Sequence, residues 1–237
     1  MGECTVFELR QYTLHAGTHD AFVRLFETHL LDSQDATGMH VLGQFRDVDR
    51  PDAFVWMRAF ADMERRREAL TAFYYGPVWA AHRDEANPMM IDSDDVLLLE
   101  PARADQSVAE HVGPRPPQGA ESAGSTEIEV VICPVRPEDT GSYLDRHDEN
   151  VMPVQQRFGG CPLPPLQSLH APNTFPGLPA HEDRHVTVTL TRYASSAAAA
   201  RVRVEPAYRE AVDRLDALAT GPVQRLRLIP TPRSALR

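Results

Sequence analysis

The first signal in the chain is the alternation of apolar and polar residues. The stretch TVFELRQYTL, Thr5–Leu14, alternates with a period of two, as a strand with one buried face does. Apolar side chains then recur at helical spacing up to Gly38, a residue typical of the position after a helix. The remaining elements predicted in this half are strands over Met39–Asp47, Ala53–Phe60 and Asp95–Leu99, and a helix over Asp62–Ala86 interrupted at Gly76-Pro77. The order β-α-β-β-α-β predicts a ferredoxin-like unit.

The second half repeats this order with weaker signals. The predicted strands are Glu127–Val135, Leu166–Ala171, His185–Tyr193 and Val223–Ile229. Helices are predicted over Pro137–Phe158 and over Ser195–Ala219, where Pro206 must break or restart the second one. We therefore predict an α+β fold made of two tandem ferredoxin-like (βαββαβ) units, a duplication in which little residue identity survives.

A change in composition separates the two halves. Residues 101–125 are rich in Pro, Gly, Ala and Ser and show no apolar period, which is typical of a linker. We expect this segment to be mobile and to add nothing to a core. The predicted organisation is a first domain over residues 1–100, the linker over 101–125 and a second, divergent domain over 126–237.

The two faces of the first predicted sheet differ in polarity. Phe7, Leu9 and Gln11 form one set on the first strand, and we expect it to lie under the helices. The opposite face is predicted to carry Glu8, Arg10, Tyr12, His40, Gln44, Arg46, Trp56 and Arg58. Two such sheets closed face to face, within one chain or between two chains, would enclose a polar pocket with an aromatic wall.

These residues suggest roles for a small-molecule site. His40 or Glu8 would move protons and Arg10 would stabilise an enolate, so these three are the catalytic candidates. The predicted substrate-binding residues on the same face are Tyr12, Gln44, Arg46, Trp56 and Arg58. The alternative is a buried ladder of ion pairs, Glu8 with Arg10, Arg46 or Arg58, that holds the sheets together and binds nothing.

Composition and charge exclude several functions. The net charge of −10 argues against nucleic acid and anionic membrane as partners. All basic residues are arginines, so lysine Schiff-base chemistry and the P-loop lysine are excluded. No apolar run approaches the roughly 18–20 residues that cross a bilayer, so no membrane insertion is expected. Three scattered cysteines and the lack of a signal-like N-terminus predict a cytoplasmic protein.

Several motifs of the first half resemble the NIPSNAP family. They are the opening ELRQY of residues 8–12, Gly43-Gln44-Phe45, FYYGPVWAAHR of residues 73–83, Ala86-Asn87 and MIDSDDVLL of residues 90–98. The resemblance covers about residues 5–100 and implies the dimeric α/β-barrel fold and a homodimer. It says little about the reaction, because proteins of this fold include cofactor-free monooxygenases, polyketide cyclases, lactone isomerases and haem proteins.

The helix that follows Gly76-Pro77 offers further candidates. Trp79, His82 and Arg83 share one side of it, where they would bind a substrate at a cavity mouth. In the alternative interpretation Trp79 is a core residue, and His82 and Arg83 pair with nearby carboxylates such as Asp92 or Asp94.

Metal and haem sites find little support in the sequence. His181-Glu182-Asp183-Arg184-His185 matches the H-E-x-x-H zinc motif, but that motif works on a helix and here a strand follows at once. By analogy with haem-binding relatives, a proximal histidine would come from the second half. The histidines considered are His147, His170, His181 and His185, of which His147 is predicted to be solvated surface. We predict no metal and no cofactor, with haem an unsupported alternative.

Two functions fit these observations. The first is a cofactor-independent enzyme, of the cyclase, isomerase or monooxygenase kind, that acts on a small hydrophobic or aromatic metabolite in bacterial secondary metabolism. The second is a non-catalytic protein that binds a small molecule or serves as a scaffold.

Overall fold

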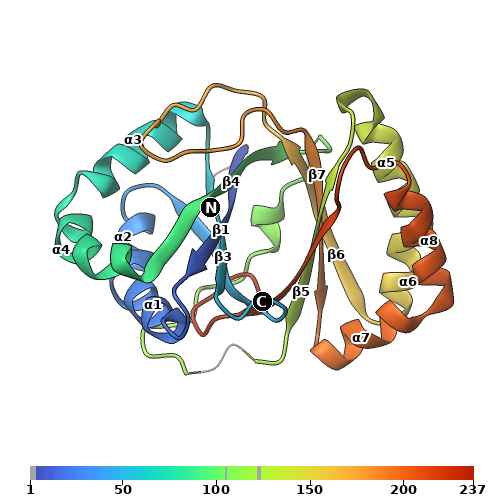
Figure 1. The fold of residues 1–237 in the computed structure, drawn as a ribbon, viewed down its shortest axis with the longest axis horizontal. Coiled ribbons are helices and arrows are strands. Elements are labelled where there is room, and N and C mark those ends of the chain that lie inside the picture. Colours follow the sequence, from blue (N-terminus) through green and yellow to red (C-terminus); the bar gives the residue numbers. More distant parts are fainter. Residues whose placement is uncertain (1–3, 105, 122–123) are drawn as a thin grey trace.

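The computed structural model describes residues 4–104, 106–121 and 124–237, and over them eight strands form one closed antiparallel barrel (Figure 1). The order around the barrel is β1-β3-β2-β8-β5-β7-β6-β4. The strands are β1 (Val6–Leu14), β2 (His40–Asp47), β3 (Ala53–Phe60), β4 (Met90–Pro101), β5 (Glu127–Pro134), β6 (Gly160–Ser168), β7 (Val186–Tyr193) and β8 (Gln224–Pro230).

Two ferredoxin-like units make up this barrel, which confirms the predicted fold. The first unit contributes the neighbours β4-β1-β3-β2 and the second contributes β8-β5-β7-β6, so each has its own strands in the order 4-1-3-2. Their helices cover opposite sides of the barrel (Figure 1). The helices of the first unit are α1 (His19–Leu25), η1 (Phe26–Leu30), α2 (Leu31–Asp35), α3 (Met63–Tyr74), α4 (Pro77–Ala86) and η2 (Asn87–Met89). The later ones are η3 (Val108–His111), η4 (Pro137–Asp139), α5 (Thr140–Arg146), η5 (His147–Val151), α6 (Met152–Arg157), α7 (Ser196–Val204) and α8 (Pro206–Asp216).

The barrel closes within one chain. Strand β2 pairs with β8 from Phe45 opposite Pro230 to Asp47 opposite Leu228. Strand β4 pairs with β6 from Leu99 opposite Ser168 to Pro101 opposite Leu166. Both junctions are short, but a closed barrel leaves no free sheet edge at either of them. A second copy of the chain is therefore not needed to complete the barrel.

The interior of the barrel is apolar and shared by both units. Phe7, Leu9 and Met57 of the first unit pack in one cluster with Val130 and Val188 of the second. The expectation that Phe7 and Leu9 lie under the helices is therefore wrong. The inside of a closed barrel is shielded from water on all sides, so the aliphatic residues of the strand face it. The polar residues of the strand face the helices, whose side chains can supply hydrogen-bond and charge partners.

The segment between the units is also part of the core. Val108 and Ala109 lie in the short helix η3, are buried and pack in the barrel cluster. Arg115 donates to the carboxylate of Asp35 and to the backbone carbonyl of Val41. The expectation that residues 101–125 supply no core is wrong, because even a segment of this composition contains two apolar side chains that pack against the barrel interior.

The first helices of the two units correspond closely. Each contains one π-helical turn, η1 at Phe26 and η5 at His147, a spacing of 121 residues. The same spacing relates Gly38 to Gly159, which both have positive φ after the helix. A π-helical turn adds a residue to the helix and re-aims the side chains beside it. These shared irregularities support the duplication more strongly than residue identity does.

Candidate functional site

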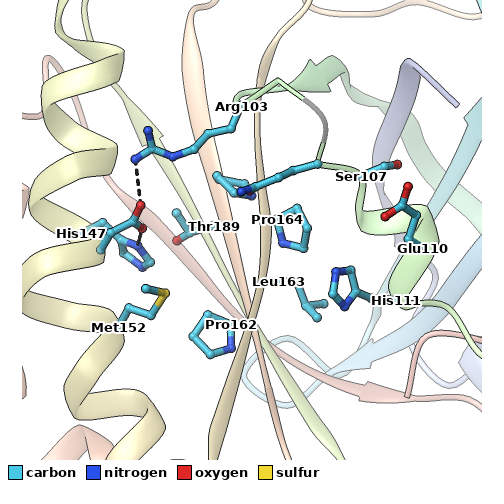
Figure 2. Close-up of a pocket in the computed structure, with 13 residues that line it drawn as sticks. Arg103, Ser107, Glu110, His111, His147, Met152, Pro162, Leu163, Pro164 and Thr189 are labelled. Carbon is cyan, nitrogen blue, oxygen red and sulfur yellow. Dashed lines mark hydrogen bonds and ion pairs between the residues drawn. The ribbon is translucent and has the colours of Figure 1, made fainter. Parts of the chain in front are cut away.

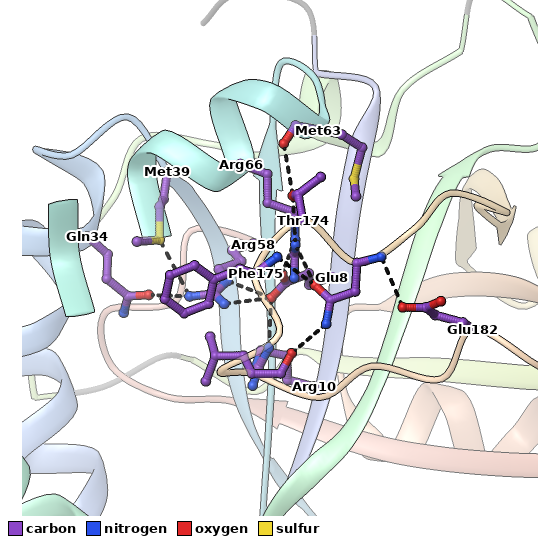
Figure 3. Close-up of polar contacts among 12 residues, drawn as sticks. Glu8, Arg10, Gln34, Met39, Arg58, Met63, Arg66, Thr174, Phe175 and Glu182 are labelled. Atoms are coloured by element: carbon purple, nitrogen blue, oxygen red, sulfur yellow. Dashed lines mark hydrogen bonds and ion pairs between the residues drawn. The ribbon is translucent and has the colours of Figure 1, made fainter. Parts of the chain in front are cut away.

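The most heavily charged buried region lies between the sheet and the helices of the first unit (Figure 3). Glu8 on β1 faces Arg58 on β3, while Arg10 is two residues along β1 and Arg66 comes from α3. Oε2 of Glu8 accepts hydrogen bonds from Arg10 Nη1 at 2.9 Å and from Arg58 Nε at 2.7 Å. Oε1 accepts one from Arg66 Nε at 2.6 Å. These four residues are called the arginine cluster below.

The arginine cluster carries more positive than negative charge. All four side chains are at most 1% exposed. Burial by itself would raise the pKa of Glu8, but the charges of Arg58, Arg10 and Arg66 outweigh it and hold that pKa well below its ordinary value. Glu8 is therefore ionised, and one carboxylate faces three guanidinium groups. The cluster retains an excess of two positive charges, an arrangement that is costly in a dry site unless another negative group shares it.

Neighbouring amide and hydroxyl groups satisfy part of the cluster. Arg58 Nη1 donates to Oε1 of Gln34 at 3.1 Å. Arg66 Nη1 donates to Oδ1 of Asn173 at 3.0 Å and lies 3.3 Å from Oγ1 of Thr174, so a loop of the second unit covers the cluster of the first (Figure 3). Among the described residues, Arg66 Nη2 and Trp56 Nε1 are buried donors without a hydrogen-bond partner.

An aromatic layer lies next to the arginine cluster. Nε of Arg10 donates to Oη of Tyr12 at 3.1 Å, and the Arg58 guanidinium lies 4.9 Å from the Trp56 ring centre. Burial raises the pKa of Tyr12 despite the charge of Arg10, so this phenol stays protonated. A cavity of about 30 Å³ lies among Tyr12, Phe22, Phe26, Leu30, Gln34, Trp56, Phe73, Tyr74, Trp79, Ala86 and Met90. This volume admits about one water molecule.

Five of the predicted face residues come together here, but on the other side of the sheet from the one expected. Glu8, Arg10, Tyr12, Trp56 and Arg58 face the helices of their own unit and not the inside of the barrel. Of the predicted ion-pair ladder, the pairs of Glu8 with Arg10 and Arg58 are confirmed. The cluster is thus positioned by both strands and helix of one unit.

His40, Gln44 and Arg46 do not join the cluster. A β-bulge between Val41 and Gly43 breaks the alternation of β2, so His40 lies opposite Ala59 while Gln44 lies opposite Trp56. Ala59 faces the barrel interior and Trp56 faces the helices, and the predicted common register is therefore wrong.

The other two residues of this strand make their own contacts. Gln44 Nε2 donates to Oε1 of Glu27 at 3.2 Å. Arg46 is 42% exposed and pairs with Asp20 at 2.6 Å, so it does not bond to Glu8 as the ladder hypothesis allowed.

The candidates on α4 are separated from one another. Trp79 lines the 30 Å³ cavity. His82 stacks on His29 with ring centres 4.0 Å apart, and exposed Arg83 lies 3.5 Å from its neighbour Asp84. The predicted pairing of His82 and Arg83 with Asp92 or Asp94 is not what the structure shows. Only Trp79 lies where a ligand of the first unit would touch it.

Sequence reasoning missed Arg66, although a signal was present. Arg66 is spaced at i, i+3, i+4 and i+7 with Ala69, Leu70 and Phe73, the buried residues of α3. An arginine on the apolar face of a helix needs a buried acidic partner. That partner is Glu8, which the sequence prediction had placed on the sheet face that points away from the helices.

Of the four histidines considered in the second half, His170 and His185 lie together, whereas His147 and His181 have other partners. Residues 181–185 form no helix; His181 Nε2 lies 3.2 Å from Asp95, and His185 Nδ1 lies 2.7 Å from His170 Nε2. Within the described ranges, no three His, Cys, Asp or Glu side chains gather closely enough to hold a metal ion. His147 is buried, so its prediction as solvated surface is wrong; the π-helical turn directs it at the sheet.

Comparison with known proteins bears first on the fold. No protein with a curated description matches the sequence. A candidate monooxygenase from Lactobacillus acidophilus NCFM shares 13% identity and a TM-score of 0.60, over 99% of this chain and 97% of its own. An anthrone oxidase-like protein shares 16% identity and a TM-score of 0.62, over 97% and 92%. At such identities these likenesses show the tandem barrel fold alone. In the part of the chain that the structure describes, no helix has the length and apolar character that a bilayer span requires.

A second comparison bears on the family. The sequence profile of the NIPSNAP family matches residues 7–104, which include β1 to β4 and hence the whole arginine cluster. The resemblance seen in the sequence motifs is confirmed over this range, and the second unit lies outside it. The first unit of this chain is therefore a NIPSNAP domain.

Proposed function

We propose that the NIPSNAP unit binds a small hydrophobic or aromatic molecule carrying an anionic oxygen, and that the protein is a cofactor-independent enzyme whose reaction passes through that anion. The observation that carries this proposal is the arginine cluster, in which one carboxylate faces three buried guanidinium groups. A ligand oxygen with a negative charge would reduce the excess, and Arg66 Nη2 and Trp56 Nε1 are buried donors that still lack an acceptor.

The aromatic layer fits the apolar part of such a molecule. Tyr12, Trp56 and Trp79 line the cavity and offer ring faces and edges to a flat ligand. The cavity as it stands holds only about one water molecule, so a ligand must displace part of the wall. Helix α4 is the element suited to move, because Ala86 is its one buried residue in the described structure. Outward movement of α4 would carry Trp79 with it and enlarge the cavity.

Proton removal is not a task for the acidic group of this cluster. Both oxygens of Glu8 already accept from arginines, and its pKa is held below the ordinary value, which makes it a poor base. His40 lies in the other register of β2. The cluster is suited to stabilising an anion whose proton leaves to water, and it thereby favours ionisation of a phenol or an enolisable ketone.

Anthrone is a suitable probe because it is an enolisable aromatic ketone. We would titrate anthrone by absorbance with and without the purified chain, in the absence of oxygen, and read the pH at which half of it is ionised. Wild-type protein should lower that midpoint, and Arg10→Met should remove most of the shift. Arg46→Met is the matched control, since it deletes an exposed arginine of the same sheet and should leave the shift unchanged.

The competing role is a purely structural ion-pair cluster, favoured by the complete pairing of Glu8. In that case anthrone would ionise at the same pH with and without protein, and it would not alter the thermal midpoint of unfolding. Turnover is then tested by admitting oxygen: an enzyme consumes the bound anion faster than free anthrone at equal pH, and a binding protein does not. Bacterial secondary metabolism, a homodimer and a cytoplasmic location remain predictions of the sequence.

A further inference from the structure

A second, open pocket lies between the second unit and the chain that follows β4 (Figure 2). Its volume is about 420 Å³, within the range of small-molecule sites. Strand β6 supplies an apolar wall of Pro162, Leu163, Pro164 and Pro165, and Met152 of α6 extends it. The polar residues come from the chain after β4, with Arg103, Ser107, Glu110 and His111, and from η5, with His147 and Asp148.

His147 is the buried polar group of this pocket. Its side chain is 8% exposed, and Nδ1 lies 3.2 Å from Oδ1 of Asp148. Arg103 Nη2 donates to Oδ2 of Asp148 at 2.7 Å (Figure 2) and to Oδ1 of Asp145 at 2.9 Å. Hydrogen bonds from His147 and Arg103 lower the pKa of Asp148, so its carboxylate is ionised and can only accept. An imidazole that is hydrogen-bonded to this carboxylate must therefore carry a proton on Nδ1, and when the ring holds one proton only, Nε2 bears none.

This tautomer leaves a free acceptor in the pocket. With the proton on Nδ1, the Nε2 atom of His147 presents a lone pair. No described residue donates a hydrogen bond to that atom in the structure. An acceptor without a protein donor, on a side chain that is only 8% exposed and beside an apolar wall, is a place where a donor group of a ligand would bind.

The same place in the first unit is filled. Glu27 stands 121 residues before Asp148, at the corresponding position of η1. It accepts from Thr231 Oγ1 at 2.6 Å and from the backbone N–H of Arg233 at 2.8 Å, because the chain after β8 folds over β2. The chain after β4 reaches the second unit in the same way but leaves the pocket open. The opening is thus a difference between two related sites and not a general property of the fold.

Charge around the pocket selects against anions. Arg103 is shared between Asp145 and Asp148, and Glu110 adds a further carboxylate, so acidic groups outnumber basic ones. We propose that this pocket binds a neutral, mostly apolar ring compound that carries a hydroxyl group, with the hydroxyl donating its hydrogen to Nε2 of His147. This ligand differs from that of the arginine cluster, which favours an anion.

The probe we would use is 2-naphthol, a flat phenol that is neutral at pH 7. Isothermal titration calorimetry on the whole purified chain would compare it with 2-methoxynaphthalene, which lacks the donor, and with 2-naphthoate, which is an anion. We expect 2-naphthol to bind about fivefold more tightly than its methyl ether, the ratio that one net hydrogen bond gives, and 2-naphthoate to bind more weakly than both.

Two variants locate the site. His147→Phe removes the acceptor and should abolish the preference for 2-naphthol over its ether, while Met152→Trp fills the pocket and should weaken both. His15→Phe changes an exposed histidine of the first unit and should alter neither. Arg10→Met identifies any binding of these probes at the arginine cluster, because only that binding should weaken in this variant. Equal affinities of naphthol and its ether for wild type, tighter binding of naphthoate, or insensitivity to both pocket variants would each overturn the proposal.

Discussion

The two units place a buried glutamate at the same position and surround it in opposite ways. In the first unit Glu8 faces three arginines and lies beside an aromatic layer. In the second unit Glu129, 121 residues on, shares Arg203 with Glu127 and accepts from the hydroxyls of Tyr193 and Tyr208. The first unit carries an excess of cationic groups, whereas in the second two acids share Arg203 and neutral hydroxyl groups donate to one of them. A duplicated scaffold has kept the buried acid and changed the groups that meet it.

The chain segments that cover the two units also differ, because one closes its unit and the other leaves a pocket open. The chain after β8 seals the first unit, where Arg233 is 6% exposed and bonds to Asp32 and to the backbone of Glu27. The chain after β4 reaches the second unit, where Arg103 is 31% exposed and borders the open pocket. The unit with excess arginines in its interior is closed, and the unit whose two buried acids share Arg203 is open. Binding in the first therefore requires movement, whereas binding in the second does not.

The largest expected effect comes from removing the charge of the first glutamate. Glu8→Gln leaves three buried guanidinium groups without a counter-charge, which should lower the free energy of unfolding by about 4 kcal/mol. Glu129→Gln should cost less, about 1–2 kcal/mol, since Arg203 keeps Glu127 and the tyrosines find an amide oxygen. Urea unfolding followed by tryptophan fluorescence measures both. Equal costs would show that the difference between the two interiors has no energetic weight.

The pH dependence of stability sharpens this contrast. The folded-state pKa of Glu8 is lowered by its arginines, so its contribution is complete above the unfolded-state value of about 4.3. As the pH falls below that value, the unfolded chain takes up a proton that the folded chain does not, and the contribution shrinks. The gap in unfolding free energy between wild type and Glu8→Gln should be constant from about pH 7 to about pH 5.5 and narrow from there toward about pH 3. A gap that widens on acidification would contradict the assigned charge state.

The element order of this fold was predictable, because it follows from local patterns. Alternation in residues 5–14 and 53–60, and the breaks at Gly76-Pro77 and Pro206, each depend on a few neighbouring residues. The strands of both units follow from them, although β4 is longer than expected and β6 spans Gly160–Ser168, so it begins six residues before the predicted Leu166 and ends before the predicted Ala171. The NIPSNAP resemblance pointed to the first unit for the same reason, since its motifs are local.

Which face of the sheet meets the helices was not predictable from alternation alone. A period of two separates Phe7 from Glu8 but does not say which set is inside. The answer depends on Arg66, on the closed barrel and on the loop at Asn173, all distant in sequence from β1. His40 was misplaced by a single β-bulge, which the apolar alternation does not show, although Gly43 within the strand is a residue typical of bulges. The open pocket of the second unit escaped notice because it needs a π-helical turn and a segment interpreted as linker.

A smaller change in stability is expected when the segments that cover the two units, the chain after β8 and the chain after β4, each lose their arginine. Arg233→Met should lower the free energy of unfolding by about 2 kcal/mol, because it breaks buried bonds to the carbonyl groups of Glu27 and Pro116 and a partly exposed one to Asp32. Arg103→Met should cost about 0.5 kcal/mol, as its ion pairs are partly exposed and screened by solvent. Unfolding at low and high salt separates them further, since only the Arg103 contribution should fall markedly with salt. A larger loss for Arg103 than for Arg233 would break the comparison.

The smallest effect concerns what the units have in common. Gly38 and Gly159 end their helices at φ of +92° and +86°, and a Cβ atom at either position would meet no other atom within 4 Å. Alanine should therefore cost only the backbone penalty, about 1 kcal/mol, and the same in both units. Gly141→Ala in α5 is the matched control, since the space around it is also open but its φ is not positive, and there alanine should stabilise by about 0.5–1 kcal/mol. Equal losses at the first two positions and a gain at the third would show that the shared skeleton is energetically alike in both units. The contrasts at Glu8 and at Arg233 then belong to the side chains that each unit has placed upon it.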